Sequence, residues 1–191
     1  MTGDQILTEA RVNFGELTAL TLTDANLKAY VNTALLELYV LLPVAELEVL
    51  AVDTTVALTA GKGKLPTTHD HLLSVAVAGV VAQSVPVDVI STIDSPFFET
   101  FVPVAASDGE NLWVRPASHT SCVVTEIVPP TAITNFALAV ILPKWHAVLV
   151  LLTTALAYAQ EEDAGQAQHY RNEALALINR TFTAPEQEAR S

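Results

Sequence analysis

Apolar residues recur every three or four positions near the start of the chain. This spacing predicts an amphipathic helix in residues 4–17, because it places one stripe of side chains on one helix face. The stripe consists of Ile6, Leu7, Ala10, Phe14 and Leu17. A longer helix is predicted between an N-cap at Thr23 or Asp24 and a stop at Pro43. Its apolar face consists of Leu27, Tyr30, Val31, Ala34, Leu35, Leu38, Leu41 and Leu42.

The pattern changes to strict alternation after Pro43. Val52, Thr54, Val56 and Leu58 point one way, which predicts a strand in residues 52–59. Further strands are predicted in residues 72–81, 85–90 and 121–130, the second at a sheet edge because Pro86 lacks an N–H donor. A hairpin with Asp108 and Gly109 at its tip is expected in residues 101–118. We expect a turn in residues 60–66 and a short helical or irregular segment in residues 91–101.

Helical periodicity returns in the last third of the chain. Pro143 suits a first helical position, and the apolar run that follows His146 ends at Gln160. This run is shorter than the roughly 20 residues that a membrane-spanning helix needs, so we expect no membrane insertion. A last helix is predicted to start at Asp163, with Gln166 completing a capping box. Its stripe consists of Ala167, Tyr170, Ala174, Leu177 and Ile178.

These elements predict an α+β fold. The N-terminal and C-terminal helix pairs are expected to form an antiparallel helical bundle, because short loops favour antiparallel neighbours. A β-rich block of short antiparallel strands is inserted between them. The predicted parts are a helix pair in residues 1–45, the β-rich insertion in 46–130, a second helix pair in 131–180 and a flexible polar tail in 181–191.

Composition narrows the classes of function. The chain has 9 basic and 21 acidic residues, a formal net charge of −12, and 51% hydrophobic residues. A surface this acidic repels phosphate, which argues against a module that reads DNA or RNA. The single cysteine, Cys122, excludes an internal disulfide and suits a reducing compartment. The N-terminal residues lack the apolar segment of a secretory signal.

Candidate chemistry is sparse. His69 and His71 flank Asp70 and are possible metal ligands, but a third ligand would have to come from elsewhere; a polar turn entering a strand is the simpler interpretation. Cys122 lies within an apolar strand and is expected to be an inert buried thiol. Trp113 and Arg115 share one strand face, and these residue types dominate interface hot spots. Equally, Trp113 could belong to the core and Arg115 could pair with a carboxylate. We expect no catalytic centre and no cofactor or metal.

The ordered combination of segments resembles a known family. The second predicted helix contains Leu27, Tyr30, Asn32, Ala34, Glu37, Leu38 and Pro43 in the sequence "LKAYVNTALLELYVLLP". The β block opens with "GKGKLP", and "ILPKW" leads into the penultimate helix. In these features, across nearly the whole chain, the sequence resembles the head-to-tail adaptor (connector) proteins of tailed bacteriophages. The long, apolar β block departs from the family pattern.

The resemblance implies a structural virion protein and not an enzyme. Such adaptors form a homo-oligomeric ring, usually of twelve subunits, in the neck of the virion after assembly in the host cytoplasm. The ring binds the portal protein and a downstream neck or tail protein. It extends the channel through which DNA passes, without sequence-specific binding, during packaging, retention and ejection. Close alternatives are a stopper or tail-completion protein; others are a metal-dependent enzyme using His69 and His71, or an acidic module for a basic partner.

The resemblance also suggests roles for particular residues. The tail is expected to contact the portal and become ordered there, through Thr181, Phe182, Thr183, Ala184 and Pro185. Trp145, Leu149, Leu152, Leu156, Trp113 and Arg115 are expected to serve subunit or core packing. Glu161, Glu162 and Asp163 are candidates for acids that face the channel lumen.

Overall fold

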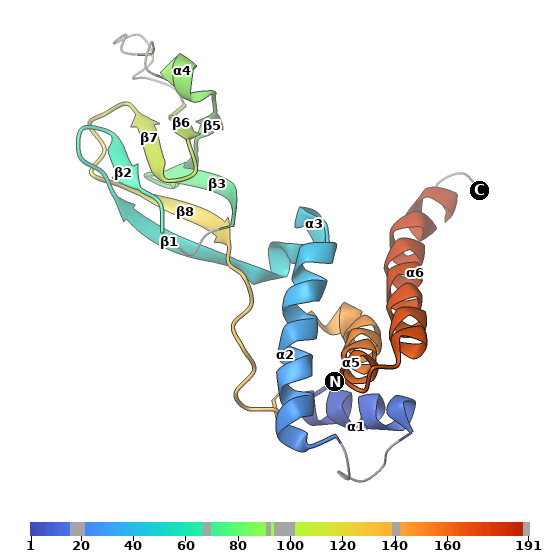
Figure 1. The fold of residues 1–191 in the computed structure, drawn as a ribbon. Coiled ribbons are helices and arrows are strands. Elements are labelled where there is room, and N and C mark those ends of the chain that lie inside the picture. Colours follow the sequence, from blue (N-terminus) through green and yellow to red (C-terminus); the bar gives the residue numbers. More distant parts are fainter. Residues whose placement is uncertain (16–21, 67–69, 91–92, 94–101, 139–141, 189–191) are drawn as a thin grey trace. The chain divides into compact units, whose positions relative to one another are not determined.

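The chain folds into two compact units. The computed structural model describes residues 1–15, 22–66, 70–90, 93, 102–138 and 142–188, with side chains up to residue 182. One unit, here the helical unit, consists of Met1–Pro43 and Pro130–Ser191, and the other, the β unit, consists of Val44–Pro129. Helices and mainly antiparallel sheets together give the expected α+β class. The β unit is therefore an insertion between the two halves of the helical unit (Figure 1).

Four long helices make up most of the helical unit. They are α1 (Gly3–Phe14), α2 (Asp24–Leu41), α5 (His146–Gln160) and α6 (Ala164–Glu188), with a short 3-10 turn, η3 (Pro143–Trp145), before α5. The helix α5 contacts each of the other three (Figure 1). The residues of α5 are apolar on almost every side of the helix, which is the composition of a buried helix. The hydroxyls of Thr153 and Thr154 are also buried, and they donate to the carbonyls of Leu149 and Val150 one turn earlier.

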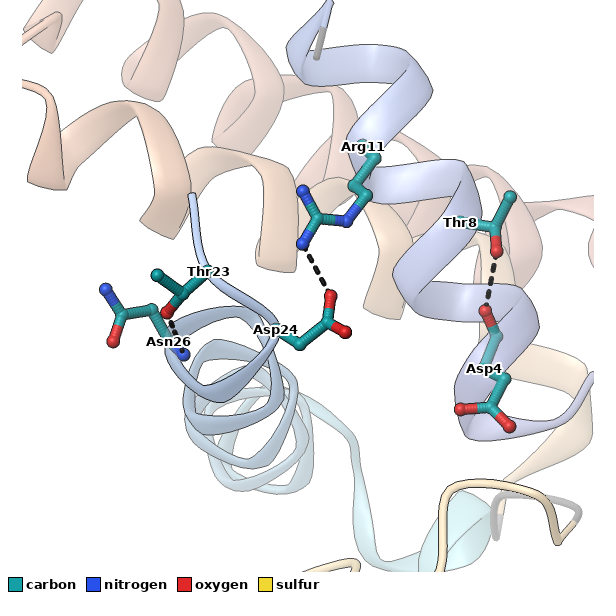
Figure 2. A network of polar contacts seen from close by, with 6 residues as sticks. All are labelled: Asp4, Thr8, Arg11, Thr23, Asp24 and Asn26. Carbon is teal, nitrogen blue, oxygen red and sulfur yellow. Dashed lines mark hydrogen bonds and ion pairs between the residues drawn. The ribbon is translucent and has the colours of Figure 1, made fainter. Parts of the chain in front are cut away.

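Figure 2 shows how the start of α2 is fixed against α1. The Thr23 hydroxyl accepts from the Asn26 amide at 3.2 Å, so Thr23 is the N-cap and the prediction of a cap here is confirmed. Asp24 has a different role: its Oδ1 accepts from Nη2 of Arg11 on α1 at 2.7 Å. The carboxylate thus lies in the first turn of α2, where a negative charge is favourable, and also ties that turn to α1.

The segment between the β unit and η3 closes the helical unit. The Asn32 side chain accepts from the Ile133 amide at 2.7 Å and donates to the Ile133 carbonyl at 3.4 Å. The amide of Asp4 donates to the Phe136 carbonyl at 2.9 Å, so this segment supplies an acceptor for the otherwise unpaired first turn of α1. Gly3 is required there, because a Cβ would lie 2.6 Å from the Phe136 ring.

The last helix differs from the prediction at its C-terminal end. Its start is confirmed, since Oδ1 of Asp163 accepts from the Gln166 amide at 3.0 Å. The helix α6 continues to Glu188, past residue 180, where the second helix pair was predicted to end. The physical reason is a contact distant in sequence: the Phe182 ring packs on Trp145, with 5.6 Å between centroids. The Thr181 hydroxyl also donates to the Leu177 carbonyl at 2.9 Å, within the helix. The flexibility expected of residues 181–191 stays a prediction.

The β unit contains two four-stranded sheets. One has the order β1 (Ala51–Ala57), β8 (Ser121–Ile127), β3 (His71–Val77) and β4 (Val80–Val81); the other has the order β2 (Lys62–Lys64), β7 (Asn111–Arg115), β6 (Val104–Ser107) and β5 (Gln83–Ser84). Three short helices complete the unit: α3 (Val44–Leu47), η1 (Glu48–Leu50) and α4 (Val87–Ile90). Residues from both sheets share one core, among them Val56, Val75, Leu112, Val114 and Val124.

The predicted strands 52–59 and 121–130 and the 101–118 hairpin are confirmed in their central residues. The β6–β7 hairpin turns at Asp108 and Gly109, and Oδ1 of Asp108 accepts from the amides of Asn111 and Glu110 at 2.7 and 3.0 Å. These hydrogen bonds, that from Asn111 foremost, lower the pKa of Asp108. Of the segment 91–101, only Ile93 lies within the described residues.

Two strand predictions are wrong, and one turn prediction is incomplete. Residues 72–81 form a hairpin, because Ala78 and Gly79 both adopt positive φ and turn the chain between β3 and β4. Residues 85–90 do not form an edge strand: Pro86 precedes the short helix α4 and its carbonyl accepts from Ile90 at 3.1 Å. Residues 60–66 are more than a turn, since they contain β2, which pairs with β7.

The expectation of antiparallel pairing throughout the β unit also fails at one place. The strand β5 pairs with β6 in parallel, with Gln83 opposite Val104 and Ser84 opposite Ala105. Parallel strands need a long connection, and the segment between β5 and β6, which contains α4, is long enough to provide one.

Candidate assembly surfaces

One stripe of the solvent-exposed surface of α2 contains no charged residue. Ala25, Ala29, Thr33, Leu36 and Val40 are all exposed and recur at helical spacing. We call these five residues the outer stripe. Its two large members are the informative ones, because Leu36 is 50% and Val40 80% exposed. The opposite face of α2 is also apolar and is buried in the helical unit. A helix that is apolar on two opposite faces is typical of one that is covered on both.

A groove borders α2, α5 and α6. Its volume is about 280 Å³. We call its apolar lining residues the floor and its polar lining residues the rim. The floor consists of Leu152, Ala155, Leu156, Ala159, Ala164 and Ala167, and the rim of Glu37, Glu162, Gln168 and Arg171. Arg171 on α6 forms an ion pair with Glu37 on α2 at this rim. We refer to this feature as the α5–α6 groove.

The residues predicted for packing divide between core and groove. Trp145 is 2% exposed, and Leu149 and Leu152 are as deeply buried. All three therefore pack within their own chain. Leu156 is partly exposed and lies in the groove floor. Of the four, only Leu156 has substantial surface left for a partner.

The three candidate lumen acids form the turn between α5 and α6. Glu161, Glu162 and Asp163 are all exposed. Asp163 has a structural role as the N-cap of α6. Glu162 adopts a positive φ of 61° and lies at the groove rim. The structure thus brings these acids together at one end of the α5–α6 groove.

The predicted portal-contact residues belong to the last part of α6. Thr181 and Phe182 are partly buried, and Phe182 packs on Trp145. Thr183, Ala184 and Pro185 have helical backbones, and their side chains lie outside the described residues. In the isolated chain, this segment is therefore already attached to the helical unit by one aromatic contact.

Trp113 and Arg115 lie on the same face of β7, as alternation predicts. Trp113 packs partly against a small cluster of Ile90, Val104 and Ala106, and the Lys62 ammonium lies 5.2 Å from its ring centroid. Nη1 of Arg115 donates to the Val114 carbonyl at 3.1 Å. Both side chains are half-buried within their own unit.

Candidate catalytic chemistry does not come together in the described part of the chain. His71 is exposed, with Nε2 3.7 Å from the Asp70 carboxylate, and His69 lies outside the described residues. No group of three metal-ligating side chains occurs among the residues that the structure describes. Burial raises the pKa of the Cys122 thiol, as expected of an inert cysteine. No described helix has both the length and the apolar character to cross a membrane.

Three of the polar contacts that join the helices were not predicted from the sequence. Tyr158 and Tyr170 both donate to the Asn13 carbonyl, and Glu37 pairs with Arg171. Each contact joins residues more than a hundred positions apart, so no local pattern could have indicated it. The charge of Glu37, between Leu36 and Leu38, was the available signal.

Comparison of the sequence with protein-family models and with curated proteins finds no match. Function has therefore to be inferred from the chain's own contacts and surfaces, and from the residues that carry the adaptor resemblance.

Proposed function

We propose that this chain is a structural virion protein, a head-to-tail adaptor. In this role, copies of the chain form a ring, with twelve as the expected number, between the capsid portal and the next neck or tail component. The ring continues the DNA channel, and the protein is not an enzyme. In this proposal the four long helices frame each subunit, and the β unit is the elaboration on that frame.

One observation carries the proposal. Two polar residues of the segment that resembles the adaptors, Asn32 and Glu37, attach α2 to the C-terminal half of the chain. Asn32 holds the backbone of Ile133, and Glu37 pairs with Arg171 on α6. These contacts explain why polar residues occur at two of the positions on which the resemblance rests. They join the terminal helix pairs despite the inserted β unit, in keeping with the helix–β–helix order on which the resemblance rests.

The charge supports the same role. A channel through which DNA slides is best lined by surfaces that do not bind phosphate. The chain has a formal net charge of −12, and three consecutive exposed acids, Glu161, Glu162 and Asp163, form one turn. We propose this turn as a lumen-facing element. The end of α6, from Thr181 to Pro185, is the proposed portal contact.

The proposal is tested by co-expressing the chain with the portal protein of its own phage and examining purified heads. Electron microscopy should show an additional ring below the portal, and native mass spectrometry should give its copy number. Failure of the chain to associate with DNA-filled heads would overturn the proposal. Density further down the neck would instead indicate a stopper or tail-completion protein.

A matched pair of variants addresses the enzyme alternative. His69→Ala together with His71→Ala should leave association with heads unchanged, because neither residue is in the helical unit. Phe182→Ala should weaken association with the portal. Loss of a bound metal in the histidine variant, together with loss of head association, would contradict the structural role.

A further inference from the structure

We infer that the α5–α6 groove receives the outer stripe of α2 from a second copy of this chain, with Leu36 and Val40 seated over the alanines of its floor. The contact is head-to-tail, since stripe and groove are different surfaces. Its closure into a ring rests on the proposed function; the contact itself does not. The chain thus provides both halves of its own assembly contact within one unit.

The outer stripe has the properties of a surface that is covered in an assembly. Val40 is 80% exposed and is the most exposed of the large apolar side chains of the described residues. Burial of a branched aliphatic side chain is favourable by roughly 1.5–3 kcal/mol, so leaving Leu36 and Val40 in water forgoes a substantial gain. Ala25 and Ala29 continue the stripe with small side chains, which let a second surface approach the helix closely.

The groove has the complementary shape and chemistry. Four of its six floor residues are alanines, namely Ala155, Ala159, Ala164 and Ala167, so the space above them is available to larger side chains. Its polar rim is largely neutralised where Arg171 pairs with Glu37. A branched aliphatic residue can therefore enter without burying an unpaired charge at that point, which would be costly.

The absence of charge on both surfaces suits a contact between two copies of this chain. Each copy has a formal net charge of −12, so two copies repel one another over most of their surfaces. The outer stripe contains no charged residue, and the groove floor contains none. These are surfaces at which two such acidic chains can meet. A basic partner would instead be expected to contact a surface rich in carboxylates, which the stripe does not offer.

Cysteine cross-linking tests the contact directly, because the only native cysteine, Cys122, is buried in the β unit. Val40→Cys and Ala159→Cys are made as separate variants of different tagged mass, both at exposed positions. They are mixed and treated with a short bis-maleimide linker. The mixture should give a mixed dimer, and the double variant should give a ladder of higher oligomers.

The control is Ala176→Cys, an exposed position nine residues after Ala167 and therefore on the far side of α6. Mixed with Val40→Cys, it should give about tenfold less product than Ala159→Cys, because a specific contact raises the effective concentration of the paired thiols. Equal yields from Ala176→Cys and Ala159→Cys would overturn the inference. So would efficient linking of Val40→Cys to itself, which indicates a two-fold contact between two α2 helices.

A charge variant provides a second measurement. Leu36→Cys should also cross-link to Ala159→Cys on a second copy. Adding Val40→Lys to the Leu36→Cys variant should abolish this cross-link. The circular dichroism spectrum should stay unchanged, since Val40 is exposed. A persistent cross-link would contradict seating of Val40 in the groove. If the contact is found but the chain never associates with heads, the adaptor proposal fails alone. If heads carry the chain without this cross-link, only the present inference fails.

Discussion

Tyr158 on α5 and Tyr170 on α6 stack against each other and share one hydrogen-bond acceptor. Their ring centroids are 5.5 Å apart and their planes differ by 10°. Both hydroxyls donate to the carbonyl of Asn13, at 3.3 and 3.1 Å. Asn13 lies in the last turn of α1, where carbonyls lack helical partners. The pair therefore satisfies the end of α1 and joins three helices at one point.

Removing one tyrosine hydroxyl should have a small effect, and removing both a larger one. Tyr158→Phe or Tyr170→Phe alone should lower the free energy of unfolding by about 0.5–1.5 kcal/mol, because the other hydroxyl still satisfies the Asn13 carbonyl. The double variant should cost more than the sum of the single changes. Urea denaturation of all four proteins measures this coupling. Strict additivity would show that the two hydroxyls do not share an acceptor in solution.

The raised pKa of Tyr158 predicts a loss of stability at alkaline pH. Burial, followed by the charges of Tyr170 and Asp163, raises the pKa of Tyr158. The folded state therefore keeps this proton at a pH where the unfolded chain releases it. The resulting stability is present below the ordinary tyrosine pKa of about 10 and is lost as pH rises through the folded value.

Tyr158→Phe should flatten this alkaline decline in the free energy of unfolding. Cys122 contributes with the same sign, because burial raises its pKa too, so both proteins are compared in a Cys122→Ala background. Thermal unfolding between pH 8 and pH 11 provides the measurement. An identical decline in the two proteins would mean that Tyr158 titrates normally.

Trp145 should be far more important for stability than Trp113. Trp145→Ala should lower the free energy of unfolding by about 3–5 kcal/mol, because the ring is 2% exposed and also supports Phe182. Trp113→Ala should cost less, since part of its ring is already in water. Helical circular dichroism during chemical denaturation distinguishes them. A stable Trp145→Ala protein would show that Trp145 is peripheral.

Asp163 should contribute to stability through its capping hydrogen bond and not through its charge. Asp163→Ala should destabilise the protein by about 1 kcal/mol, because it removes the acceptor for the Gln166 amide. Asp163→Asn keeps an acceptor oxygen, removes the charge and should be nearly neutral. Glu161→Ala, in the same exposed turn, is the matched control and should also be neutral. Thermal shifts measured on the three variants test this order, and equal losses would contradict it.

A buried carboxylate in the β unit depends on one threonine. Glu126 is 1% exposed; its Oε1 accepts from the Thr54 hydroxyl at 2.8 Å, and its Oε2 has no partner among the described residues. Thr54→Val should lower the free energy of unfolding by about 1–3 kcal/mol, since it removes that donor. Thr55→Val, the exposed neighbour on the opposite strand face, should have little effect. Comparable losses would show that the Thr54–Glu126 bond contributes nothing.

The outcome for the strands shows where local pattern stops being sufficient. The run from residue 72 to 81 has the composition of one continuous strand. It turns at Ala78 because that residue adopts a positive φ, which costs a residue with a Cβ about 1–2 kcal/mol. Gly79, the second residue of the turn, is the one local signal, because glycine adopts a positive φ without a steric penalty. The turn is favoured because β3 and β4 can then pair, a gain that exists only in the folded sheet.

Local chemistry determined the helices and their starts. Periodic apolar residues marked α1, α2 and α6, and a continuous apolar run after Pro143 marked α5. A cap at Thr23 or Asp24 and one at Asp163 could be predicted, because a cap bonds to amides only two or three residues away. Tertiary structure alone decided the continuation of α6 past Thr181, the groove beside α5 and the pairing of Glu37 with Arg171. Each of these depends on which distant surfaces meet. The free energy of such contacts arises from burial and charge pairing between segments, which the order of residues along the chain does not reveal.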